Sequence, residues 1–142
     1  MIKDVLITPL SIIGSPEGNV LHGMKETDEG FSGFSEAYFS EINFDSVKAW
    51  KRHKEMTLNL IVPVGEIRFV LFDKREETKG LFQEVILSQN NYCRLTIPAK
   101  IWVGFQGLSK SGSMLLNIAD IRHNFEEAER KGIEEIKFNW RK

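Results

Sequence analysis

The chain has 142 residues, a formal net charge of −1 and a single cysteine, Cys93. This length suits one domain with a sizeable core, and the near-zero charge excludes a general attraction to nucleic acid or to an anionic membrane. One cysteine excludes an intrachain disulfide and a cysteine-based zinc site, and no apolar run approaches the ~20 residues that cross a bilayer. We therefore expect one domain over residues 1–142, in a soluble cytoplasmic protein whose start lacks a signal-peptide pattern.

Short alternating segments separated by turn residues dominate the chain. Residues 9–13 and 19–24 indicate two strands around a turn that contains Pro16 and Gly18. Residues 33–42 alternate with a period of two, which favours a strand over a helix. Pro63 lies inside a strand-like run and indicates an edge strand or a bulge. Further strands are expected at 46–53, 58–65, 66–73, 80–88, 93–98, 101–105 and 113–119.

Only residues 124–132 have a helical pattern. Asn124 can cap the helix, Glu126 and Glu127 suit its first turn, and Gly132 can end it. We expect about two turns here, with the charged side chains on an exposed face. Roughly ten strands with no linker and no repeat indicate an antiparallel sandwich, jelly roll or barrel.

Two stretches, VGEIRFVLFDKRE and LSQNNYCRLTIPAKIWVGFQGLS, resemble the dTDP-4-dehydrorhamnose 3,5-epimerase family. The resemblance spans roughly residues 10–130, and it implies an all-β, cupin-type double-sheet jelly roll with one short C-terminal helix. It also implies a homodimer that pairs through the early strands. The matching positions are Gly65, Asp73, Arg75, Leu87, Ser88, Asn91, Leu95, Ile97, Pro98, Gly104, Phe105, Leu108 and Ser109.

This resemblance also implies an activity. Members of the family act on nucleotide-linked 4-keto-6-deoxy sugars, in pathways that feed surface polysaccharides such as lipopolysaccharide and O-antigen. A histidine removes a proton next to the ketone, the enolate is reprotonated from the other face, and no cofactor takes part. His53 falls at the position of that base, and an imidazole with a pKa near ~6.5 suits such chemistry.

The chain departs from the family pattern at four positions. Trp50, Leu58, Val103 and Asn117 stand where the family has an arginine, a lysine, a histidine and a tyrosine. The family's orienting carboxylate belongs to a C-terminal part that we expect to be missing beyond Lys142. Two other interpretations therefore stay open: a nucleotide-sugar-binding module with reduced catalysis, and a sugar 3,4-ketoisomerase, whose paired histidines Lys51 would interrupt.

A metal site is not expected. Metallo-cupins place ligands at positions that here are Lys51, His53, Leu58 and Val103, and a lysine with two aliphatic residues cannot complete the coordination of a divalent ion.

The remaining site candidates come from strand alternation and from the chemistry of their side chains. Alternation puts Ala49, Lys51 and His53 on one face and Trp50, Arg52 and Lys54 on the other. His53 is the catalytic candidate, and an exposed histidine in a basic strand end is the alternative. His22 and His123 are expected at the surface or as caps. The candidates for substrate binding are Lys51, Arg52 and Arg68 for the diphosphate, Asn117 and Tyr38 for the sugar, and Trp102 for stacking.

Overall fold

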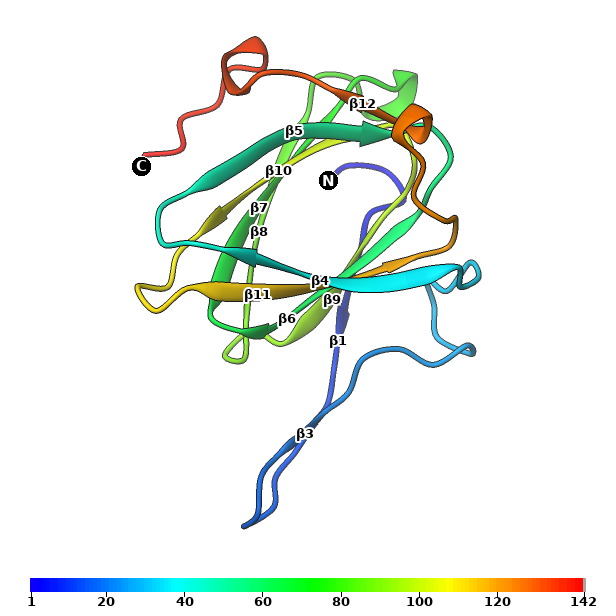
Figure 1. Ribbon diagram of the computed structural model, residues 1–142. Coiled ribbons are helices and arrows are strands. Elements are labelled where there is room, and N and C mark those ends of the chain that lie inside the picture. Colours follow the sequence, from blue (N-terminus) through cyan, green and yellow to red (C-terminus); the bar gives the residue numbers. More distant parts are fainter. Residues whose placement is uncertain (142) are drawn as a thin grey trace.

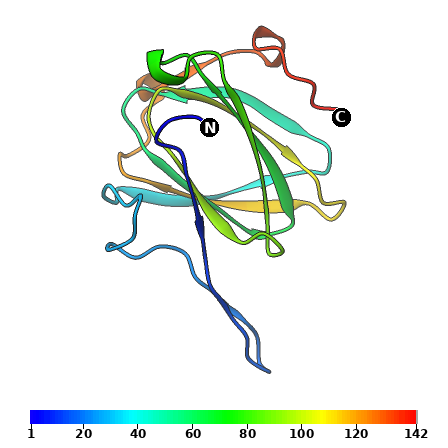
Figure 2. The same cartoon turned by 180° about the vertical axis from the view of Figure 1, so that it is seen from behind.

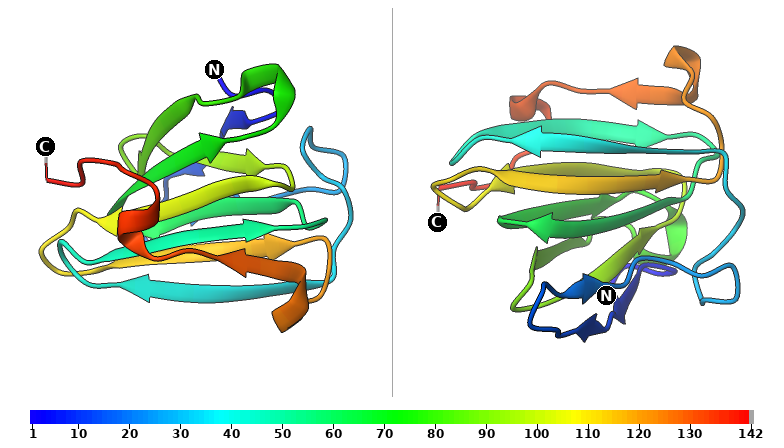
Figure 3. Two further views of the ribbon diagram at one scale, coloured as in Figure 1. Left: turned by 90° about the horizontal axis from the view of Figure 1, so that it is seen from above. Right: turned by 60° about the horizontal axis from the view of Figure 1, so that its bottom comes forward.

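Two five-stranded antiparallel sheets face each other in the computed structural model, which describes residues 1–141. Figures 1 and 3 show the two layers. The architecture confirms the all-β, cupin-type double-sheet jelly roll that the sequence predicted. The first sheet contains, in spatial order, β1 (Leu6–Pro9), β9 (Cys93–Ile97), β6 (Leu58–Val64), β11 (Ser113–Ala119) and β4 (Glu36–Ile42). The second contains β12 (Ala128–Arg130), β5 (Val47–His53), β10 (Ile101–Gly107), β7 (Glu66–Asp73) and β8 (Phe82–Ser88).

The core fills only part of the space between the sheets. Ile67, Phe69 and Leu71 of β7 point inward and are fully buried, and they pack with Leu60 and Leu95 of the first sheet. Each such side chain contributes about 1.5–3 kcal/mol through burial. The other end of the sandwich, between β4, β11 and β6 on one side and β5 and β10 on the other, holds a cavity instead.

A small hairpin extends away from this body. Strands β2 (Ile12–Ile13) and β3 (Val20–Leu21) pair only with each other, and Figures 1 and 2 show them projecting as an arm. The turn predicted between them is present.

The C-terminal segment covers the outer face of the second sheet. It leaves β12, forms the 3-10 turn η3 (Ile133–Glu135), and packs Ile136 and Trp140 against Trp50, Val70 and Trp102. Figure 3 shows this segment lying across the strands. No helix among the described residues is long and apolar enough to span a membrane.

The predicted helix at 124–132 is wrong. Asn124 does cap a turn, since its side chain accepts a hydrogen bond from the Glu126 backbone, but the turn is the 3-10 element η2 (Phe125–Glu127). The chain then becomes the strand β12, which pairs with β5. A two-turn helix is marginal by itself, and pairing with a sheet edge satisfies the backbone groups better.

Pro63 marks a bulge rather than an edge. Strand β6 lies inside the first sheet, and its register against β11 shifts between the pairs Val64–Met114 and Ile61–Leu116. Proline has no backbone N–H to donate to a neighbouring strand, and the bulge at this point of β6 accommodates that missing hydrogen bond.

A buried carboxylate anchors the turn after β7. Asp73 is fully buried and accepts hydrogen bonds from the Arg75 backbone, the Arg75 guanidinium and the Thr78 hydroxyl, the last within the 3-10 turn η1 (Glu76–Thr78). Burial alone would raise the pKa of Asp73, but these donors outweigh it and lower the pKa. Asp73 and Arg75, two of the positions that match the family, therefore have a structural role in this turn.

Gly104 is required by close packing on the outer face. A Cβ atom there would lie 2.8 Å from the Ala49 Cβ and 3.0 Å from the Trp140 ring. We expect Gly104→Ala to lower the free energy of unfolding by about 1–3 kcal/mol through overpacking, measured by denaturant unfolding. Gly14→Ala, whose Cβ would make only an ordinary 3.6 Å contact, is the control, with a change within about 0.5 kcal/mol. Equal stability of the two variants would contradict this packing.

Candidate functional site

A cavity of about 400 Å³ opens between the two sheets at the end that the core leaves unfilled. Its size falls in the range of about 300–1,000 Å³ typical of small-molecule sites. Of the described residues that line it, none is an aspartate or a glutamate, whereas several are cationic. The lining residues are Tyr38, Ser40, Lys48, Ala49, Trp50, Lys51, His53, Leu58, Leu60, Val103, Phe105, Leu115, Asn117, Arg130 and Lys131.

A bulge in β5 determines which side chains enter the cavity. Lys51 pairs with Val103 and Lys48 pairs with Phe105, so two residues of β5 lie opposite Gly104. The extra residue changes the alternation: Ala49 packs with the outer cluster around Trp50, and Lys48 and Lys51 line the cavity. The predicted positions of Lys51 and His53 at the cavity are confirmed. Ala49 also lines the cavity, and it packs against the outer cluster as well.

His53 is held by a carboxylate from the C-terminal segment. Its Nδ1 lies 2.7 Å from Oε1 of Glu127, and the two side chains are only 7% and 9% exposed. The other Glu127 oxygen accepts hydrogen bonds from the backbone N–H groups of Glu55 (2.6 Å) and Met56 (3.2 Å). Glu127 therefore links the end of β5, the turn after it and η2, and leaves the His53 Nε2 as the ring nitrogen that can act in the cavity.

The pKa directions favour an ionised Glu127 beside a neutral His53. Burial would raise the pKa of Glu127, but hydrogen bonds from Glu55, His53 and Met56 lower it on balance. Burial lowers the pKa of His53 and nearby Lys51 lowers it further, while the contact with Glu127 opposes this shift only in part. A neutral imidazole that donates its Nδ1 proton to a carboxylate carries a lone pair on Nε2, which is the state that a general base requires.

Glu127 is the functional residue that the sequence did not reveal. We expected it on an exposed helix face, and we expected the orienting carboxylate to be missing; both expectations are wrong. The pairing of Ala128 with His53 across β12 and β5 brings Glu127 to the base. Two adjacent glutamates after a capping asparagine were the only local signal, and they fit a helix start equally well.

The opposing sheet contributes polar groups to the same cavity. Tyr38 on β4 pairs directly with Asn117 on β11, so both side chains lie on one face of the sheet. The Asn117 amide donates to the Ser40 hydroxyl at 3.2 Å. Burial, together with the charge of Glu36, raises the pKa of Tyr38, which keeps its hydroxyl protonated at neutral pH. The sequence therefore selected Tyr38 and Asn117 correctly as cavity residues.

Three other predicted binding residues face away from the cavity. Arg52 forms an ion pair with Glu129 at 3.1 Å and lies over the Trp102 ring, 4.7 Å from its centroid. Arg68 is directed to the same outer face, 4.0 Å from Glu84. Strand alternation explains this, because Arg52, Arg68 and Trp102 neighbour the inward residues of their strands. These three candidates for substrate binding therefore do not line the pocket of His53.

His22 and His123 also lie outside the cavity. The His22 carbonyl accepts a hydrogen bond from the Tyr92 hydroxyl, and the His123 backbone donates to Glu36. Within residues 1–141, no group of three or more His, Cys, Asp or Glu side chains is arranged to hold a metal ion.

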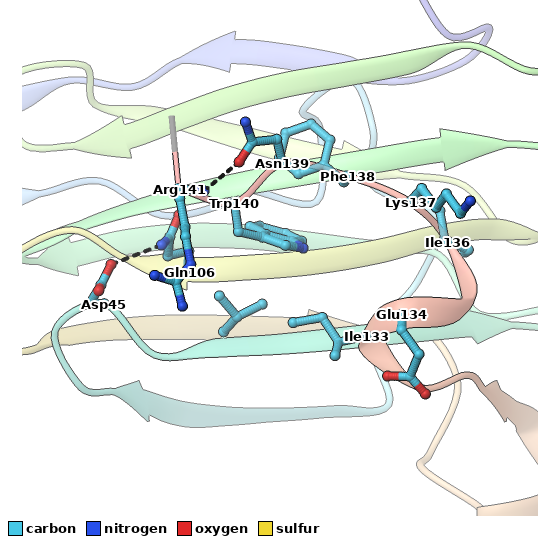
Figure 4. A pocket seen from close by; sticks show the side chains of 11 residues that line it. Asp45, Gln106, Ile133, Glu134, Ile136, Lys137, Phe138, Asn139, Trp140 and Arg141 are labelled. Carbon is cyan, nitrogen blue, oxygen red and sulfur yellow. Dashed lines mark hydrogen bonds between the residues drawn. The ribbon is translucent and has the colours of Figure 1, made fainter.

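A second cavity, of about 820 Å³, lies on the outer face beneath the C-terminal segment. Figure 4 shows Trp140 at its centre and the hydrogen bond from Gln106 to Asp45, which spans 3.1 Å. It is the larger of the two, but no histidine or cysteine is among the described residues that line it, and the buried Gln106 carboxamide is paired with Asp45. The His53 cavity is therefore the candidate active site.

Comparison with known proteins agrees with this geometry. No family model matches the chain. The crystal structure of a dTDP sugar isomerase from Desulfovibrio desulfuricans G20 is 38% identical and superposes with a TM-score of 0.93, over 98% of this chain and 92% of that one. The chain therefore belongs to the family of this dTDP sugar isomerase.

More distant sugar epimerases are also similar to this chain. The dTDP-4-dehydrorhamnose 3,5-epimerase from Elizabethkingia anophelis NUHP1 is 19% identical, with a TM-score of 0.81, over 98% of this chain and 82% of that one. A probable low-salt glycan biosynthesis epimerase, Agl13 of Haloferax volcanii, is 25% identical over 93% of this chain and 87% of its own length. The family resemblance predicted from the sequence motifs is confirmed, and the chain is an enzyme of the sugar epimerase and isomerase class.

The His53–Glu127 contact can be tested by titration of the imidazole in NMR spectra. We expect a His53 pKa below the ordinary value of about 6.5. Glu127→Gln removes an interaction that raises this pKa and should lower it further, whereas Lys51→Gln removes one that lowers it and should raise it. Glu129→Gln, which loses a partner of Arg52 rather than of His53, should leave it unchanged. A rise in the Glu127→Gln variant would contradict the assignment.

Proposed function

We propose that this protein is a metal-independent epimerase that acts on a nucleoside-diphosphate-linked 4-keto-6-deoxy sugar, with His53 as the base. One observation carries the proposal: the buried His53–Glu127 pair opens into a cation-lined cavity whose opposite wall presents the Tyr38 hydroxyl. The family's members include proteins named as dTDP-sugar isomerases and as a glycan biosynthesis epimerase. We accordingly infer a role in the synthesis of a surface polysaccharide such as lipopolysaccharide or O-antigen.

The first step is removal of a proton next to the ketone. Nε2 of His53 accepts the proton, the electrons of the C–H bond form a carbon–carbon double bond, and the ketone becomes an enolate. Glu127 stabilises the imidazolium that results and keeps the ring oriented by its bond to Nδ1. A base positioned in this way contributes roughly 10²–10⁴ to the rate.

The second step returns a proton from the other side. His53 belongs to the second sheet and Tyr38 to the first, so a sugar held between the sheets meets the base on one face and a phenol on the other. Tyr38 donates its proton to the carbanion carbon and inverts that centre; solvent then restores the phenol and removes the proton from His53. This takes over the role of the tyrosine that the family resemblance placed at Asn117. Asn117, fixed to Ser40, is left to bind a sugar hydroxyl.

The charges of the cavity suit a nucleotide-linked substrate. Although the chain has a net charge of −1, the cationic residues Lys48, Lys51 and Arg130 line the cavity. The apolar residues Leu58 and Leu60 line it as well. A cationic pocket of this kind suits a substrate that carries a diphosphate.

Glu127 also bears on the two alternative functions. The binding-module interpretation depended on a base without its carboxylate, and Glu127 supplies that carboxylate. A 3,4-ketoisomerase moves a proton between neighbouring carbons and has no need of a donor on the opposite face, whereas Tyr38 lies there. Both observations favour an epimerase.

A homodimer in the cytoplasm remains part of the proposal. The β2–β3 arm projects from the body with Ile13 and Val20 more than half exposed, and the edge strand β4 exposes Phe39. Apolar side chains on an arm and on an open sheet edge favour pairing with a second copy.

The proposed base can be tested by solvent exchange. Incubation with a dTDP-4-keto-6-deoxy sugar in D₂O should place deuterium at C3 or C5, and His53→Ala should slow this roughly 10²–10⁴-fold. His22→Gln, outside the cavity, should exchange at the wild-type rate. Background-level exchange by the wild-type protein, or full exchange by His53→Ala, would refute the assignment.

A further inference from the structure

Two cations face each other in the cavity without an anion between them. Arg130 of β12 is the direct cross-strand partner of Lys51 of β5, and both line the cavity. Among residues 1–141, neither forms an ion pair with a carboxylate. Like charges placed directly opposite in an antiparallel pair are destabilising, so this arrangement favours a bound anion over the empty pocket.

The two cations differ in depth and in their neighbours. Arg130 is exposed, and its guanidinium lies over the Phe125 ring, 5.0 Å from the centroid, at the outer edge of the sheet. Lys51 is half-buried, and burial, followed by the charge of Arg130, lowers its pKa. It lies two residues before His53 on the same strand face, roughly 6.5 Å along the strand, and it lowers the pKa of His53 through its charge.

The different positions of Arg130 and Lys51 suit the two negative charges of the reaction, which are on the diphosphate and on the enolate oxygen. The diphosphate is charged before, during and after proton transfer, so it needs a cation at the mouth where the nucleotide leaves the cavity. The enolate oxygen is charged only once His53 has taken the proton, and it lies one bond from the carbon that His53 attacks. A cation beside the base can reach this oxygen. Among the described lining residues, Lys51 is the cation that lies next to His53 on the same face of β5.

We propose that Lys51 is the catalytic cation that stabilises the enolate oxygen, and that Arg130 binds the diphosphate. The inference rests on the proposed function. As His53 removes the proton, the π electrons of the ketone move to its oxygen, and the Lys51 ammonium donates a hydrogen bond to the oxyanion without transferring its proton. The electrons return to the carbonyl when Tyr38 protonates the carbon. Leu58, at the position of the family's lysine, cannot supply this charge.

The two roles predict different kinetic effects. An interaction made only in the transition state changes kcat, whereas one made equally in the ground state changes KM. Lys51→Gln should lower kcat for exchange at the carbon next to the ketone by roughly 10²–10³, the loss expected for one oxyanion donor, with KM changed little. Arg130→Gln should raise KM by roughly 10-fold or more and leave kcat nearly unchanged.

A binding measurement makes the test independent of turnover. Calorimetric titration with dTDP, which has no ketone, should show wild-type affinity for Lys51→Gln and roughly 10-fold weaker binding for Arg130→Gln. Lys54→Gln, an exposed lysine just after β5, is the control and should match the wild type in both assays. Loss of dTDP affinity in Lys51→Gln, or an unchanged kcat in that variant, overturns the role of Lys51 while the epimerase proposal stands. Absence of exchange by the wild-type protein refutes the epimerase proposal itself.

Discussion

The hydrogen bond between His53 Nδ1 and Glu127 joins parts of the chain that are 74 residues apart, and the arrangement of the site depends on it. Glu127 also accepts hydrogen bonds from the backbone N–H groups of Glu55 and Met56. With His53, three donors therefore satisfy the buried carboxylate. Such a carboxylate is costly to bury unless every partner is present. The same contacts hold β12 along β5 and thereby bring Arg130 opposite Lys51.

The local sequence pattern predicted most of the strands of this protein and part of its candidate site. Period-two alternation identified the long strands, and it put Lys51, His53, Tyr38 and Asn117 on inward faces, where they line one cavity. Arg52, Arg68 and Trp102 were selected for the site although each neighbours an inward residue of its strand, so that alternation points their side chains outward. Here the pattern was available, and we gave more weight to charge and aromatic character than to the face of the strand.

What the sequence could not reveal depends on contacts between distant segments. The bulge in β5 places both Ala49 and Trp50 opposite Gly104 of β10, and no local sequence pattern records this pairing. Residues 125–130 fit a short helix until β5 offers them a sheet edge, and the orientation of Glu127 follows from that pairing. The residue that completes the base was therefore hidden in a segment whose structure is decided by its partner strand.

The central claim is that acid and base reach the sugar from opposing sheets, and Tyr38→Phe tests it most directly. In D₂O, with a dTDP-4-keto-6-deoxy sugar, this variant should still exchange the proton next to the ketone through His53, with retention of configuration. Inversion at that carbon should fall by roughly 10²–10⁴, the contribution of a positioned proton donor. Inversion at the wild-type rate, or exchange and inversion that fall together, would contradict the account.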